Sequence, residues 1–191
     1  MSFHAFNRAI VRTPSRSVVD GLRAVDVGAP NHEGVLREHA AYVHALEALG
    51  VGVETLPALE AFPDSVFVED TALVFTGAAI LLRPGAATRR GEAAAMAATL
   101  ERNFERVLRL EDGTAEGGDV LATPRAVFIG ASARTSVGGA AALVSLLAQI
   151  GRQGIVVKTP PGVLHLKSDC SMLDEETILC TGRLAAAEPF P

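Results

Sequence analysis

The sequence has few cysteines, no long apolar stretch and no excess of basic residues. Its two cysteines, Cys170 and Cys180, cannot form a disulfide framework and have no metal-ligand spacing with the five histidines. No stretch approaches the roughly 20 apolar residues that span a bilayer. The N-terminus lacks the charged segment and long apolar segment of a signal peptide. We therefore expect a cytoplasmic protein without a metal, a cofactor or a membrane partner.

The charge balance also excludes a class of partner. Lysine and arginine together number 17 against 22 acidic residues, and the formal net charge of −5 comes with no basic stripe. This argues against nucleic acid as a partner. Hydrophobic residues make up 49% of the chain, so residues 1–191 are expected to fold as a single globular domain. A homodimer is compatible with this composition.

What the sequence does contain is an internal period of 49 residues. Asp70, Asp119 and Ser168 occupy corresponding positions, and each precedes two short apolar segments that read as strands. Helices are expected to follow over residues 91–102 and 137–150, and closing strands over residues 106–110 and 155–158. The repeating element is therefore predicted to be β-β-α-β.

An earlier unit and a later, shorter one extend this pattern. Residues 8–12, 31–49 and 51–56 read as a strand, a helix and a strand, whereas the last unit stops as its helix begins at residues 184–188. Repeated units must stack in a line or close into a ring to bury their faces. A closed ring of five units would need about 60 more residues by this period. The ring is then smaller, is completed by another chain, or is incomplete in the chain as given.

Charged residues fall at the same phase of successive units, and a ring would bring them together at its axis. The first of these groups, Glu69 with Asp70, lies close to Asp64 in an apolar segment that favours β-structure. Buried carboxylates are costly unless a cation or hydrogen-bond donors satisfy them. A planar guanidinium matches grouped carboxylates best. The segment therefore predicts a pocket for a small cationic molecule, and the ring would add Glu116 and His165 to it.

The motifs along the chain resemble those of the dimethylarginine dimethylaminohydrolase family, within the guanidine-modifying group (penteins) that includes arginine deiminase. The matches keep their order: RTPSRS at 12–17, VDGL at 19–22, FPDSVFVED at 62–70, RRGE at 89–92, EGGD at 116–119, ARTS at 133–136 and LHLKS at 164–168. The resemblance implies an α+β fold, a five-bladed α/β propeller with the active site on its axis. It also implies a nucleophilic cysteine in a C-terminal strand, beyond residue 191.

The implied reaction converts a methylated arginine into citrulline and a methylamine through a covalent thiouronium on that cysteine. By the resemblance, Asp70 and Glu116 would hold the substrate guanidinium. His165, in a predicted apolar strand over residues 163–166, would be the general acid and base, which its ordinary pKa near 6.5 suits. We further expect Glu116 to hydrogen-bond His165 and set its orientation.

The amino-acid end of such a substrate needs the opposite chemistry. Arg89 and Arg134 are expected to bind its α-carboxylate. Asp64 would pair with its α-amino group, assisted, by resemblance only, by the backbone carbonyl of Leu22. Glu69 either lines the pocket or holds Arg89, and the sequence does not separate these two roles.

Three other interpretations stay open. An arginine deiminase is the nearest one in chemistry, although the helical domain typical of deiminases does not fit between Asp70 and Glu116. A non-catalytic binder of arginine or guanidines would keep the charged residues and lack the thiol. An incomplete ring would expose a sheet edge and aggregate. Cys170 is a rival nucleophile, but a cysteine in such a segment is more often a small buried hydrophobic residue.

Overall fold

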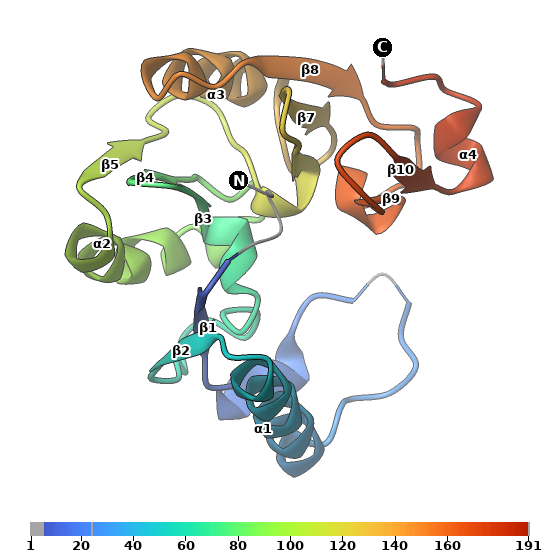
Figure 1. Cartoon of the computed structure of the whole chain (residues 1–191). Helices are drawn as coiled ribbons and strands as arrows, with labels where there is room; N and C mark the ends of the chain where they lie inside the picture. Colours follow the sequence, from blue (N-terminus) through green and yellow to red (C-terminus); the bar gives the residue numbers. More distant parts are fainter. Residues whose placement is uncertain (1–5, 24, 191) are drawn as a thin grey trace. The chain divides into compact units, whose positions relative to one another are not determined.

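The computed structural model describes residues 6–23 and 25–190, which form two compact units (Figure 1). The first unit ends at Val68, and the second begins at Glu69 and holds the remaining described residues. Within the described residues, no helix combines the length and the apolar character needed to cross a bilayer.

The first unit is a single crossover between two parallel strands. It contains β1 (Arg8–Arg12), the 3₁₀ turn η1 (Arg16–Asp20), α1 (His32–Ala48) and β2 (Gly52–Leu56). The two strands pair with Arg8 opposite Gly52 and Arg12 opposite Leu56. Asn31 caps α1, because its side chain accepts a hydrogen bond from the Gly34 amide. The strand, helix and strand predicted here are confirmed to within one or two residues.

The second unit begins with two copies of the predicted repeat. The first copy contains β3 (Ala72–Phe75), β4 (Ala78–Leu81), α2 (Glu92–Asn103) and β5 (Arg106–Arg109). The second contains β6 (Val120–Ala122), β7 (Val127–Ala131), α3 (Val137–Gln149) and β8 (Gly154–Lys158). In both copies the middle strand pairs antiparallel with the strand before it and parallel with the strand after the helix. The β-β-α-β prediction is therefore confirmed, and the mixed sheets with their helices give an α+β fold.

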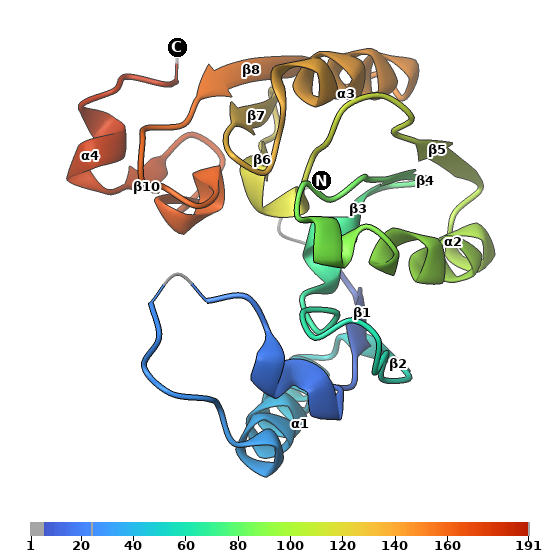
Figure 2. The same cartoon turned by 180° about the vertical axis from the view of Figure 1, so that it is seen from behind.

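A third, shorter copy follows. It contains β9 (Cys170–Met172), β10 (Ile178–Cys180) and the short helix α4 (Gly182–Ala185). The strands form an antiparallel hairpin in which Cys170 lies opposite Cys180. Figure 2 shows α3 lying along β8.

The hydrophobic core is shared between successive repeats. One cluster joins residues of the first repeat, such as Leu73 and Ile80, to residues of the second, such as Val120 and Ile129. Another joins the opposite side of the second repeat to the third. Each repeat therefore buries apolar surface against its neighbour, as stacked repeat units must.

The expected strand over residues 163–166 is wrong. His165 is followed directly by a 3₁₀ turn, η5 (Leu166–Ser168), and Ser168 donates its amide to the His165 carbonyl. Leu166 is fully buried while Leu164 is 49% exposed, so the two leucines do not share the face that strand alternation predicts. The physical reason is that the Leu166 amide bonds a buried carboxylate, Asp119, in place of a neighbouring strand.

Candidate active site

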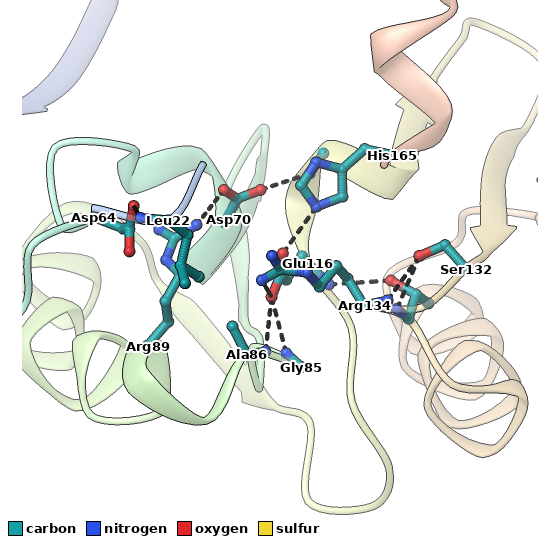
Figure 3. Close-up of polar contacts among 12 residues, drawn as sticks. Leu22, Asp64, Asp70, Gly85, Ala86, Arg89, Glu116, Ser132, Arg134 and His165 are labelled. Atoms are coloured by element: carbon teal, nitrogen blue, oxygen red, sulfur yellow. Dashed lines mark hydrogen bonds and ion pairs between the residues drawn. The ribbon is translucent and has the colours of Figure 1, made fainter. Parts of the chain in front are cut away.

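Three side chains from successive repeats of the second unit converge (Figure 3). Asp70 lies in the turn η2 (Val68–Thr71), Glu116 directly before η4 (Gly117–Asp119), and His165 directly before η5. One polar atom from each of the three lies within 4.8 Å of the others. Each short turn leads into the first strand of its repeat, so corresponding turns of successive repeats bring these polar side chains together.

Glu116 is completely buried and fully engaged. Its Oε1 accepts hydrogen bonds from the amides of Gly85 and Ala86 at 3.0 and 3.2 Å, and lies 3.6 Å from Nη1 of Arg134. Burial alone raises the pKa of Glu116, but the hydrogen bonds from His165 and Ala86 and the charge of Arg134 outweigh it and lower the pKa to about 2. Glu116 therefore remains ionised at neutral pH.

The hydrogen bond expected between Glu116 and His165 is present. Nε2 of His165 lies 2.8 Å from Oε2 of Glu116. Burial lowers the pKa of His165, but this hydrogen bond and the charges of Asp70, Asp119 and Glu116 raise it above its ordinary value overall. The imidazole therefore keeps a proton more readily near neutral pH than an ordinary histidine, which is what a general acid needs.

Gly118 lets the His165 ring approach the backbone. A Cβ atom at position 118 would lie 2.7 Å from Nδ1 of His165 and 3.1 Å from Oδ1 of Asp70. A Cβ at Gly117 would lie 2.0 Å from the carbonyl oxygen of Glu69. The Gly-Gly pair of the EGGD motif is therefore required by close packing, because any side chain would displace the site.

Asp70 pairs with an arginine of the protein itself. Its Oδ2 lies 2.5 Å from Nη1 of Arg89, and its Oδ1 accepts the Gly118 amide at 3.0 Å. Arg89 also donates to Glu92, from Nε at 3.1 Å and from Nη2 at 2.7 Å. Burial lowers the pKa of Arg89, but the two carboxylates raise it overall, so this buried guanidinium stays charged.

Sequence reasoning missed Glu92, although its spacing offered a signal. Glu92 starts α2 three residues after Arg89, a separation at which side chains on a helical turn face each other. The sequence left two roles for Glu69, and the structure places its carboxylate in an ion pair with Lys167. The Glu69 side chain is 65% exposed in that pair.

The remaining candidates lie in two places. Arg134 belongs to the loop between β7 and α3, where its amide donates to Oγ of Ser132 at 3.0 Å. Leu22 and Asp64 belong to the first unit, where Oδ1 of Asp64 accepts the Leu22 amide at 3.0 Å. Both line a cavity of about 450 Å³ in that unit, which also includes His39 and Tyr42.

Neither cysteine has the character of a nucleophile. Sγ of Cys170 is buried and lies 3.3 Å from the Leu166 carbonyl oxygen, and burial raises the pKa of this thiol to about 11. A thiol with such a pKa is almost entirely protonated at neutral pH. Cys180 is half-buried and packs against the same apolar cluster as Cys170.

Asp70, Glu116 and His165 are also ligand types that metal ions bind, and their spacing suits a shared cation. Both oxygens of Asp70 and both of Glu116 already interact with donors of the protein. We therefore assign no metal to this group.

Known proteins share this fold. The N-terminal domain of a cyanobacterial arginine dihydrolase superposes with a TM-score of 0.78 at 19% identity, over 95% of this chain and 70% of that one, which shows a common fold. The sequence model for eukaryotic N,N-dimethylarginine dimethylhydrolases matches residues 27–180. The chain belongs to the dimethylarginine dimethylaminohydrolase family.

Two bacterial relatives bear this out. The dimethylarginine dimethylaminohydrolase of Pseudomonas aeruginosa is 40% identical over 187 residues, which cover 97% of this chain and 73% of that protein. The enzyme of Streptomyces coelicolor is 35% identical and is covered to 67%. A solved structure of the Pseudomonas enzyme, a Cys-to-Ser mutant complexed with citrulline, superposes with a TM-score of 0.91 over 95% of this chain and 71% of that one.

Proposed function

We propose that this protein hydrolyses Nω-methylated arginines to citrulline and a methylamine. The observation that carries the proposal is the hydrogen bond between the buried Glu116 and His165, made beside Asp70. It joins an ionised carboxylate to an imidazole with a raised pKa where a cationic guanidinium would be attracted. Relatives named for this reaction support the proposal.

We assign substrate binding to the charged residues around this pair. Asp70 and Glu116 would hold the guanidinium, and Arg134 and Arg89 the α-carboxylate. The buried contacts of Arg89 with Asp70 and Glu92 favour a second role, in which Arg89 keeps Asp70 ionised and in place.

The α-amino group would then be bound by Asp64 and the carbonyl of Leu22, with Glu69 at the edge of the pocket. The hydrogen bond between Asp64 and Leu22 supports this assignment, because it holds the two residues together.

The chemistry follows from one acid–base group and one thiolate. The thiolate attacks the guanidinium carbon and forms a C–S bond, while His165 gives its proton to the departing methylamine and the C–N bond breaks. His165 then takes a proton from water, whose oxygen bonds to the same carbon. Cleavage of the C–S bond returns the thiolate, and the hydroxyl proton is lost to solvent as the carbonyl of citrulline forms. Because Cys170 and Cys180 do not fit this role, we place the thiol outside residues 1–191.

The repeats support a wider architecture as part of the same proposal. Successive β-β-α-β copies that share core clusters favour one domain built as a five-bladed α/β propeller.

The two free cysteines favour a cytoplasmic location. We expect no nucleic-acid or membrane partner. Light scattering would test whether a homodimer forms.

Two related functions are distinguished by their products. An arginine deiminase would release ammonia from arginine itself, and a non-catalytic binder would release no citrulline. The test is to titrate the purified protein with asymmetric dimethylarginine and with arginine by calorimetry. Citrulline and dimethylamine are then assayed with the protein isolated from its source.

Preferred binding of the methylated compound, with one dimethylamine released for each citrulline, would support the proposal. Ammonia release from arginine would favour the deiminase. Binding without any citrulline, in that natural protein, would favour the binder.

A further inference from the structure

Asp119 is a buried carboxylate to which the proposed chemistry gives no role. It ends η4, three residues after Glu116, and is completely shielded from solvent. Its Oδ1 accepts the Leu166 amide at 2.9 Å. Its Oδ2 accepts the hydroxyls of Ser132 at 2.6 Å and Thr135 at 2.7 Å. Three donors from two other segments of the chain therefore meet on one side chain.

Each of these donors adjoins a residue of the candidate site. Leu166 directly follows His165 in the chain. Oγ of Ser132 accepts the amide of Arg134 at 3.0 Å. Oγ1 of Thr135 accepts the amide of Glu116 at 3.2 Å. One carboxylate thus links the backbone at Glu116, Arg134 and His165, which come from three different loops.

The chemistry of the contacts explains why a carboxylate stands at position 119. All three partners donate, and an ionised carboxylate offers acceptors on both oxygens, whereas an amide would turn a donor toward some of them. Burial raises the pKa of Asp119 and outweighs the lowering effect of these hydrogen bonds, so the pKa lies above its ordinary value. A buried charge of this kind is costly. Donor groups of the protein occupy both oxygens of Asp119. We therefore attribute the benefit that offsets this cost to the loop arrangement that these hydrogen bonds fix.

We infer that Asp119 is a positioning residue, which aligns Glu116, Arg134 and His165 by fixing the loops that carry them. The hydroxyls of Ser132 and Thr135 relay this alignment, since each bonds Asp119 on one side and a site backbone amide on the other. The inference rests on the proposed function only for what the aligned residues do, because the alignment itself is a matter of geometry.

The deciding variant is Thr135→Val, which removes the relay without removing the charge of Asp119. We expect the pKa of His165, measured by NMR titration, to fall toward its ordinary value as the Glu116–His165 hydrogen bond is lost. The kcat for citrulline release should fall about tenfold or more. Thr135→Ser keeps the hydroxyl. It should restore the pKa of His165 and bring kcat to within about twofold of the unsubstituted protein.

Thr159→Val is a matched control. Thr159 is also buried, at 8% exposure, but its Oγ1 makes no hydrogen bond within the described residues. This change should leave the pKa of His165 and kcat unaltered. If the pKa of His165 is the same in the Thr135→Val and Thr159→Val proteins, the positioning role is wrong.

Should Thr135→Val fail to fold, Ser132→Ala tests the other relay, at a residue that is only partly buried. It should raise KM through Arg134 and lower the pKa of His165. Unchanged values of both would overturn the inference. The NMR measurement needs no catalysis. If the protein isolated from its source releases no citrulline, the proposed function is rejected and this test stays intact.

Discussion

Nε2 of His165 and Oε2 of Glu116 lie 2.8 Å apart, although 49 residues separate the two in the chain. The pKa of Glu116 is lowered and that of His165 is raised, so each partner stabilises the charged form of the other. An ion pair of this kind holds the proton on the imidazole, where a leaving amine would need it.

Glu116→Gln should affect turnover more than substrate affinity. The glutamine keeps the shape of the side chain and loses the charge, so the pKa of His165 should fall and kcat should drop by about 100-fold. Steady-state kinetics and an NMR titration of His165 measure the two effects. Glu176→Gln, at a carboxylate that is 77% exposed, serves as the control and should change neither. An equal loss in affinity and turnover would reject the orienting role.

The stability of the protein should depend on Glu116 in acid. A carboxyl group whose folded-state pKa is depressed stabilises the fold above its unfolded pKa, and this contribution is lost as the pH falls through the folded value. For Glu116 the window lies between its ordinary value of 4.5 and about 2. Urea unfolding between pH 2 and pH 7 should show a loss of stability there. A Glu116→Gln protein with the same acid dependence would contradict this assignment.

Gly118→Ala should disable the site through contact alone. The added methyl group would lie 2.7 Å from Nδ1 and 2.8 Å from Cγ of His165, so the ring must move away from Glu116. We expect citrulline release to fall by about 100-fold or more, since small displacements of catalytic groups have effects of this size. Gly138→Ala is the comparison, because a Cβ there meets no atom within 4 Å. It should keep activity, and equal activity of the two variants would refute the steric argument.

Arg89→Ala should destabilise the second unit. The change leaves the buried carboxylates of Asp70 and Glu92 without their cation, and breaking a buried ion pair in this way costs about 3–5 kcal/mol. Denaturant unfolding would measure it. Arg125→Ala removes an ion pair whose partners are 80% and 77% exposed, and should leave the unfolding midpoint unchanged. Similar midpoints for the two variants would mean that the buried network contributes no stability.

The repeat was predictable because its signals are local. Short apolar segments at a constant spacing define the strands, and the periodicity of residues such as Leu143 and Leu147 defines α3. Asp70, Glu116 and His165 belong to polar groups that lie near corresponding positions of successive repeats, and this predicted that they meet without any knowledge of the loops between them. The family motifs added the identity of the chemistry.

The features that the sequence did not predict depend on contacts between distant residues, which no local sequence pattern indicates. The segment before η5 reads as a strand because its apolar residues alternate, but a buried carboxylate 47 residues earlier takes the amide of Leu166. Asp119 itself looked like the start of a strand, and its three donors come from loops that the sequence does not place. Pairing of Arg89 with Asp70 was missed for the same reason, since both residues were assigned to a substrate.

The two three-stranded sheets and the candidate site differ in how far apart in the sequence their contacting residues lie. Residues 72–109 complete one sheet and residues 120–158 the other, whereas the bonds from Gly118 to Asp70, Leu166 to Asp119 and His165 to Glu116 connect residues 47 to 49 apart. Closing long loops costs more entropy than closing short ones. Each sheet therefore closes within one repeat, whereas the candidate site assembles only when short turns from three successive repeats have come together.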